Sequence, residues 1–237
     1  MTAILKKELI SYYATMLAYV FMAIFCLISG LYFVTNNILA GSSSYTTVLS
    51  NVCYVMILVV PILTMRSFSE ERRNRSDQLL FTSPVRLVSI LAAKYLAALI
   101  VLAGALCLTL VQVVILIIYG SPSASEIFVG YLGILLMGSA FISVGLFISS
   151  LSANQLTAAV ATMGILLLFW MLDMLITRIA NPVIGGLIGF FSVFSYFAPF
   201  RQCMLSLSSV VYLVSFTALF LFLTWVVIIR RSVAEGR

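Results

Sequence analysis

Long uncharged stretches alternate with short charged segments along this chain. The stretches without any Asp, Glu, Lys or Arg cover residues 9–65, 95–125, 127–172 and 202–229. Polar residues near positions 36, 43 and 152 divide the first and third of these stretches. A helix that crosses a bilayer needs about 20 mostly apolar residues. The pattern therefore predicts six membrane-spanning helices, at about residues 15–34, 46–65, 88–119, 127–148, 156–176 and 209–229.

Residues 179–200 form another uncharged stretch, but its composition argues against a seventh span. It contains Asn181, Pro182, the pair Gly185-Gly186 and Pro199. In a lipid-facing helix these residues would leave backbone groups without hydrogen bonds. We therefore predict short or re-entrant helices on the outer side of the membrane, before the sixth span.

The distribution of basic residues predicts the orientation. With six spans, eleven of the 13 Lys and Arg residues fall on the side that holds both termini and the loop between spans two and three. Only Arg178 and Arg201 fall on the other side. Cytoplasmic loops carry an excess of Lys and Arg. We therefore expect both termini to be cytoplasmic.

Composition supports a membrane protein and excludes several other classes. Charged residues make up 8% of the 237 residues and apolar residues 63%, whereas a soluble domain has about 25% charged residues. A soluble globular domain, a disordered chain and a disulfide scaffold are therefore excluded. The chain has no His, and its four Cys are scattered without C-x-x-C spacing, so no metal site is predicted. The predicted fold is an all-α membrane protein, a single transmembrane domain over residues 1–237.

The N-terminal residues 1–13 precede the first span and are predicted to form a short amphipathic helix at the inner membrane interface. Its apolar face would hold Ile4, Leu5, Leu9 and Tyr12. Lys6, Lys7 and Glu8 would lie mostly off that face. Because the basic residues follow Ile4 and Leu5 and the next apolar stretch is long, we do not expect a cleavable signal peptide.

Most of the charged chemistry is concentrated in residues 69–78, directly after the second span. Glu71 and Arg75, and likewise Arg73 and Asp77, have the i,i+4 spacing of helical ion pairs. No Gly or Pro interrupts the segment, so the second span is expected to continue as a helix into the cytoplasm. A helix that is polar on all sides is not held by a core and needs a partner. The alternative is that this loop only fixes the topology.

The same region resembles a known family. Residues 61–73 read PILTMRSFSEERR, and residues 77–85 read DQLLFTSPV. This pattern is similar to the signature of ABC-2 type permeases, the membrane subunits of ATP-binding cassette exporters, and most of all to the gliding-motility branch. The aromatic residues of segment 191–200 resemble the outer aromatic helices of that family. Span order and loop placement extend the resemblance over nearly the whole chain.

The resemblance implies a transport subunit rather than an enzyme. The chain lacks a G-x-x-x-x-G-K-[S/T] loop that would hold ATP phosphates, so a separate ATPase subunit would bind ATP and Mg. The polar segment would be the coupling helix that docks on this ATPase. Its contact residues would be Glu70, Glu71, Arg72, Arg73 and Asp77.

Other partners implied by the resemblance are a second permease chain, as a homodimer or a related permease, and an accessory extracytoplasmic subunit. Membrane lipid would surround the chain, and no nucleic acid is expected. The expected location is the plasma (inner) membrane of a prokaryote. The direction implied is export.

Single polar residues within the spans are further candidates. Asp173 lies near the outer end of the fifth span, and an intramembrane acid is a candidate for a gating or substrate role. Hydration at the interface is the simpler alternative. Gln112, Asn51 and Gln202 are expected to form interhelical hydrogen bonds. Small residues on the fourth span are expected to permit close helix packing: Gly130, Gly133, Gly138, Ser139, Ser143 and Gly145.

Two other function classes fit the sequence less well. An integral-membrane enzyme needs His, paired carboxylates or a metal cluster, and the only acid deep in a span is Asp173. An ion-coupled secondary transporter commonly has ionisable groups near the midplane and inverted repeats. The second class remains the alternative to the ABC permease.

Overall fold

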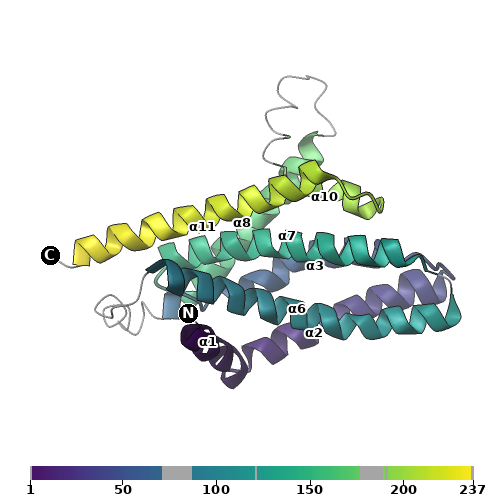
Figure 1. The fold of residues 1–237 in the computed structure, drawn as a ribbon, viewed down its shortest axis with the longest axis horizontal. Helices are drawn as coiled ribbons and strands as arrows, with labels where there is room; N and C mark the ends of the chain where they lie inside the picture. Colours follow the sequence, from purple (N-terminus) through teal and green to yellow (C-terminus); the bar gives the residue numbers. More distant parts are fainter. Residues whose placement is uncertain (1, 71–86, 121, 177–188, 190–191, 236–237) are drawn as a thin grey trace.

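The computed structural model describes residues 2–70, 87–120, 122–176, 189 and 192–235. At residues 176 and 231–235 it describes the backbone only. The described elements are all helices. They are α1 (Thr2–Ala14), α2 (Leu17–Phe33), the π-helix η1 (Val34–Leu39), α3 (Thr46–Thr64), α6 (Leu87–Tyr119), α7 (Ala124–Leu151), α8 (Gln155–Ile176), α10 (Val193–Arg201) and α11 (Leu207–Glu235). The long helices run side by side, whereas α1 lies across the bundle and is seen end-on (Figure 1).

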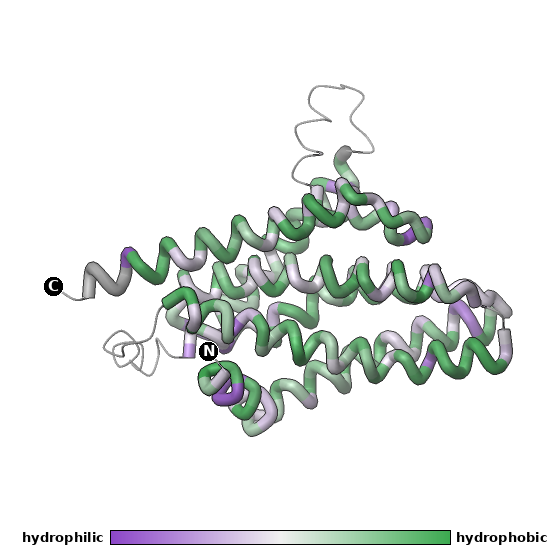
Figure 2. The backbone as a smooth tube through the Cα atoms, viewed as in Figure 1, coloured by the Kyte–Doolittle hydropathy of each residue, from purple (hydrophilic) through white to green (hydrophobic). Residues whose placement is uncertain are grey.

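Six helices in the described part of the chain are long and apolar enough to cross a membrane, which confirms the predicted all-helical fold with six spans. They cover Leu17–Leu39, Thr46–Thr64, Leu87–Tyr119, Ala124–Leu151, Gln155–Leu175 and Leu207–Arg230. Hydrophobic residues line these helices along most of their length, and hydrophilic residues are found on α1 and near the helix ends (Figure 2).

Helix α7 forms the centre of the bundle. In the most apolar 18-residue part of α7, 78% of the residues are buried, whereas the corresponding share is 17% for both α8 and α11. The predicted small-residue packing is confirmed, because a Cβ atom at Gly133 would lie 2.8 Å from Phe200, and one at Gly145 would collide with Thr64. Glycine at these positions lets α10 and α3 approach the α7 backbone closely. The weakly buried α8 and α11 present their apolar faces outward.

The first span is longer than predicted, because the polar residues near position 36 do not end it. The helix continues as η1 to Leu39. Within it the Thr35 hydroxyl donates to the Leu31 carbonyl at 3.0 Å, and the Asn36 amide donates to the Tyr32 carbonyl at 2.9 Å. Side chains that bond back to the preceding turn satisfy their own polarity without ending a helix.

The prediction that the second span continues unbroken into the polar segment is wrong. Helix α3 ends at Thr64, residues 65–68 form turns, and a new helical stretch begins at Ser69. The amide of Ser67 donates to the Thr64 carbonyl at 3.1 Å, which is a turn bond and not a helical one. The cause is a set of contacts with distant helices, described below.

The ends of the bundle differ in chemistry, and we name them accordingly. Figure 1 places α1, the end of α3, the start of α6 and the C-terminal part of α11 at one end, which we call the charged end. The loop between η1 and α3 and the short helix α10 lie toward the opposite end. Of the predicted outer element 179–200, residues 179–188 and 190–191 lie outside the described residues, and α10 accounts for the rest.

Candidate functional site

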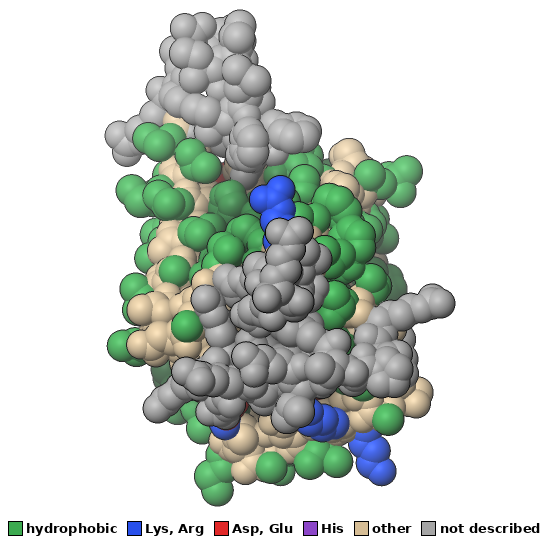
Figure 3. Space-filling view, turned by 90° about the vertical axis from the view of Figure 1, so that its left-hand side faces the viewer, with side chains coloured by type: hydrophobic (Ala, Val, Ile, Leu, Met, Phe, Trp, Pro, Cys, Tyr) green, Lys and Arg blue, Asp and Glu red, His purple; other side chains and the backbone are tan. Residues whose placement is uncertain are grey.

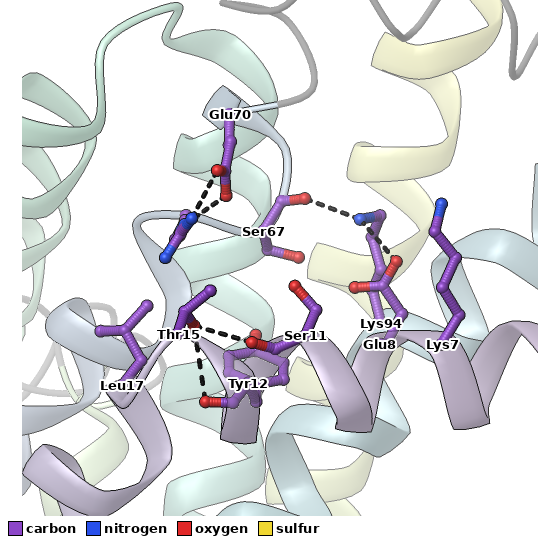
Figure 4. A pocket seen from close by; sticks show the side chains of 10 residues that line it. Lys7, Glu8, Ser11, Tyr12, Thr15, Leu17, Ser67, Glu70 and Lys94 are labelled. Atoms are coloured by element: carbon purple, nitrogen blue, oxygen red, sulfur yellow. Dashed lines mark hydrogen bonds and ion pairs between the residues drawn. The ribbon is translucent and has the colours of Figure 1, made fainter.

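Charged side chains meet at the charged end of the bundle around a small pocket. Figure 3 looks onto this end and shows Lys and Arg side chains there. The pocket has a volume of about 190 Å³ and lies between α1, the turn after α3 and the start of α6. Its lining residues are Lys7, Glu8, Ser11, Tyr12, Thr15, Leu17, Arg66, Ser67, Glu70 and Lys94 (Figure 4).

Lys94 is the most buried charge among the described residues, with 2% of its surface exposed. Its ammonium group donates to the carbonyl of Ser67 at 2.7 Å and to the Glu8 carboxylate at 3.2 Å. It also lies 5.1 Å from the centre of the Phe68 ring, within the range of a cation–π contact. A buried charge needs such partners to offset the loss of hydration. Lys94 therefore joins α6 to α1 and to the turn after α3.

This pairing corrects the prediction for the N-terminal helix. Glu8 was expected to lie off the packed face, but its side chain is only 13% exposed and belongs to that face. The reason is Lys94, which is buried and has an acidic partner within reach on α1. Of the residues predicted on the apolar face, Tyr12 is buried, and the placement of this helix at the membrane interface stays a prediction.

Tyr12 makes a second link between α1 and the end of α3. Its hydroxyl donates to the carbonyl of Leu63 at 3.3 Å. That carbonyl belongs to the last turn of α3, where helical partners run out. Burial, and then the nearby Glu8 carboxylate, raise the pKa of Tyr12 above its ordinary value, so the phenol stays a donor.

Ser149, near the end of α7, holds the turn after α3 from the other side. Its hydroxyl oxygen accepts hydrogen bonds from the amides of Phe68 at 3.1 Å and Ser69 at 3.3 Å. The same hydroxyl donates a hydrogen bond to the carbonyl of Met65 at 3.3 Å. These amides open a new helix and would otherwise lack partners. Ser149 thus serves as a cap supplied by another helix, and this is why α3 breaks here.

Glu70 is the one predicted coupling residue that the structure describes. It forms a two-point ion pair with the guanidinium of Arg66, four residues earlier. This pair raises the pKa of Arg66. About 30% of the Glu70 side chain is exposed. Its contact with an ATPase stays a prediction. The other predicted coupling residues, Glu71, Arg72, Arg73 and Asp77, lie outside the described residues.

Asp173 lies at the opposite end, far from this cluster in the fold. Its carboxylate accepts hydrogen bonds from the hydroxyls of Ser192 at 2.8 Å and Ser195 at 2.6 Å. Ser192 is the N-cap of α10 and accepts the amide of Ser195. Asp173 therefore fastens α8 to the start of α10. Its gating or substrate role stays a prediction.

Sequence reasoning missed Lys94, Glu8 and Ser149 as structural connectors. The available signal was Lys94 itself, a single cation a few residues inside an apolar helix, where charges normally have a partner and a role. The count of basic residues on each side of the membrane uses Lys94 only as a signal of orientation. Among the described residues, no three His, Cys, Asp or Glu side chains are close enough to hold a metal ion.

The six spans define a class: a multi-pass helical membrane protein. A comparison with protein-family models then identifies the family. The model described as ABC-2 family transporter protein matches residues 31–229. The chain belongs to this family, and membership implies an ABC ATPase as partner. A search of curated proteins gave no match.

Proposed function

We propose that this chain is the permease subunit of an ABC exporter in the plasma membrane of a prokaryote, with both termini in the cytoplasm. Two permease chains would form the transport path, and separate ATPase subunits would bind ATP and Mg and hydrolyse the nucleotide. Family membership supports this proposal. The excess of Lys and Arg in the two termini and in the loop between spans two and three supports the orientation. The gliding-motility branch and an accessory outer subunit stay predictions.

The observation that carries the coupling mechanism is the way the segment beginning at Ser69 is attached. Lys94 holds the turn before it to α6 and α1, and Ser149 holds it to α7. A force that an ATPase applies to the polar segment would reach three helices at once through these bonds. Helix α7 is the buried centre of the bundle. In this mechanism the charged end converts ATPase movement into rearrangement of the spans.

The proposal is tested by expressing the chain with the ABC ATPases of its source organism and asking which of them co-purifies with it. Replacing both Glu70 and Glu71 by Lys would place like charges against basic residues of the ATPase. Such a juxtaposition makes the binding free energy less favourable by roughly several kcal/mol. We expect loss of the ATPase from the purified complex and loss of stimulated ATP hydrolysis in proteoliposomes. The matched control is Glu126→Lys at the start of α7, at the opposite end.

Two results would contradict the proposal. If the wild-type chain co-purifies with no ATPase, the proposed coupling to a separate ATPase subunit is wrong. If the Glu70/Glu71 reversal binds and stimulates the ATPase as the wild type does, the polar segment only sets the topology.

A further inference from the structure

A second cavity lies toward the opposite end of the bundle, between the start of α3 and the end of α10. Its volume is about 330 Å³. Eight residues line it, and one of them is Ala198. The other seven have side chains that can form hydrogen bonds: Thr46, Thr47, Ser50, Asn51, Tyr54, Arg201 and Gln202. The cavity lies at the end of a membrane-spanning helix, and Thr47, Arg201 and Gln202 are exposed there.

Several of these polar groups have no partner. Among the described residues, the side chains of Thr47, Asn51 and Gln202 make no hydrogen bond. The interhelical bonds predicted for Asn51 and Gln202 are therefore absent from the described structure. Gln112 behaves differently and confirms its prediction, because its amide oxygen accepts from Ser29 at 3.0 Å and from Tyr45 at 2.8 Å. The groups around the cavity are open to a ligand.

Arg201 is the one charged residue among the eight that line the cavity. The Arg201 guanidinium donates to the Tyr54 hydroxyl at 3.4 Å, and no carboxylate of the described residues lies within ion-pair distance of it. Asp173 is bonded to the serines at the start of α10 instead. The N-terminal end of α3 and the C-terminal end of α10 both border the cavity, and their dipoles oppose each other. The Glu126 carboxylate acts electrostatically on Cys203, next to Gln202. Arg201 therefore sets the charge of the lining itself and not of the whole neighbourhood.

An aromatic wall adjoins this cation. The Tyr54 ring stacks on Phe194 with centroids 5.6 Å apart, and Trp170 meets the Tyr54 ring edge-on at 6.1 Å. The Tyr54 side chain thus has its hydroxyl at Arg201 and its ring in an apolar cluster. A cavity with convergent polar groups beside an aromatic surface matches a ligand that is itself polar at one end and apolar at the other.

We propose that this cavity binds the anionic headgroup of an amphipathic molecule, a phosphate or a carboxylate, with Arg201 as its ion-pair partner and Asn51 and Gln202 as donors. A guanidinium pairs with these groups through two parallel hydrogen bonds. The apolar part of the ligand lies along the Tyr54 ring, which is in contact with Trp170 outside the lining. The inference rests on the proposed transport function and names its substrate class.

The chain offers its own reporter for a binding test. It has two tryptophans, and Trp225→Phe leaves Trp170 as the only one. The purified variant in dodecyl maltoside is titrated with decyl phosphate, and the emission of Trp170 is recorded. We expect a saturable change with decyl phosphate and none with decyltrimethylammonium at the same concentrations. Inorganic phosphate is expected to bind at least about tenfold more weakly, because it gains nothing from the aromatic wall.

Variants in the same single-tryptophan background identify the site. Arg201→Gln is expected to weaken decyl phosphate binding about tenfold or more, since a hydrogen-bonded ion pair is lost. Arg201→Lys should retain part of the affinity, and Asn51→Leu should weaken binding about threefold while breaking no internal bond. Arg230→Gln, at the charged end of α11, is the matched control and should bind as the parent does. Elution volume and helical circular dichroism verify the fold of each variant.

Three results would overturn the proposal. The first is an equal response to the cationic and the anionic amphipath. The second is inorganic phosphate binding as tightly as decyl phosphate. The third is unchanged binding in Arg201→Gln together with a smaller complex mass, which would make the cavity a contact between two copies of the chain. None of these measurements involves the ATPase, so their failure and a failure of the permease assignment are distinguishable.

Discussion

The two ends of this bundle both hold polar clusters, but the clusters are built in opposite ways. At the charged end Lys94 is paired with Glu8, and Arg66 is paired with Glu70. At the opposite cavity Arg201 reaches only a phenol, and the amide of Asn51 has no partner among the described residues. Side chains that satisfy one another hold helices together. Side chains left open in a cavity are available to a ligand.

This difference leads to a general expectation for substitutions in the two regions. Changes to the connectors Glu8, Lys94 and Ser149 at the charged end should lower the stability of the fold, because each removes a bond between helices. Changes at the opposite cavity should leave stability alone and alter binding. The predictions below run from the largest expected loss of stability to the smallest, all measured by thermal unfolding in the same detergent.

The largest effect is expected for Glu8→Gln. It removes the acid that neutralises Lys94, and a buried ion pair that loses one member costs about 3–5 kcal/mol. The double variant Glu8→Gln with Lys94→Met removes the buried ammonium group as well and should recover much of the loss. If Glu8→Gln alone unfolds at the wild-type temperature, the Lys94 pair does not hold α1 to the bundle.

A smaller loss is expected for Ser149→Ala. The amides of Phe68 and Ser69 would then lose their acceptor, and an unsatisfied buried group costs about 1–3 kcal/mol. Ser143→Ala, on the same helix, is the control, because the buried Ser143 hydroxyl bonds within its own helix to the Ala140 carbonyl at 2.7 Å. Equal melting of the two variants would show that the cap on the turn after α3 is unimportant.

Asp173→Asn sharpens the comparison, because Asp173 is a paired group at the opposite end. It loses the charge that strengthens its bonds to Ser192 and Ser195 but keeps one acceptor oxygen, so a loss of about 1 kcal/mol is expected. The result should resemble those at the charged end rather than those at the neighbouring cavity. An unchanged unfolding temperature would mean that the bonds of Asp173 to Ser192 and Ser195 do not stabilise the contact between α8 and α10.

The smallest effect is expected for Gln202→Ala. Its side chain is exposed and makes no hydrogen bond within the described residues, so the change in stability should stay within about 0.5 kcal/mol. Affinity for decyl phosphate should nevertheless fall. A clear loss of stability in this variant would remove the distinction between paired and open clusters.

The sequence was sufficient to predict the six spans, their order and the close packing along α7. These features depend on hydropathy and on residue size, which act locally. The continuation of α2 through residues near 36 was missed because Thr35 and Asn36 bond to their own helix, which their polarity alone does not reveal.

The break after Thr64 and the Lys94 pair were missed for a different reason. Ser149 is 81 residues from Phe68, and Lys94 is 86 residues from Glu8. Periodicity within one helix carries no information on such contacts. Likewise, sequence alone did not separate Gln112, which is satisfied across helices, from Asn51, which is not. Only the arrangement of neighbouring helices shows whether a polar side chain has a hydrogen-bond partner on another helix or has none.

The central claim, that the polar segment after α3 is the ATPase dock, is tested most directly by exchanging the two members of the Arg66–Glu70 pair. The double variant Arg66→Glu with Glu70→Arg can re-form the internal pair with the charges exchanged. The account predicts wild-type thermal stability but little ATPase in the co-purified complex, because the charge facing the ATPase is reversed. Normal capture of the ATPase by this variant would contradict the account and leave Glu70 with a structural role inside the chain.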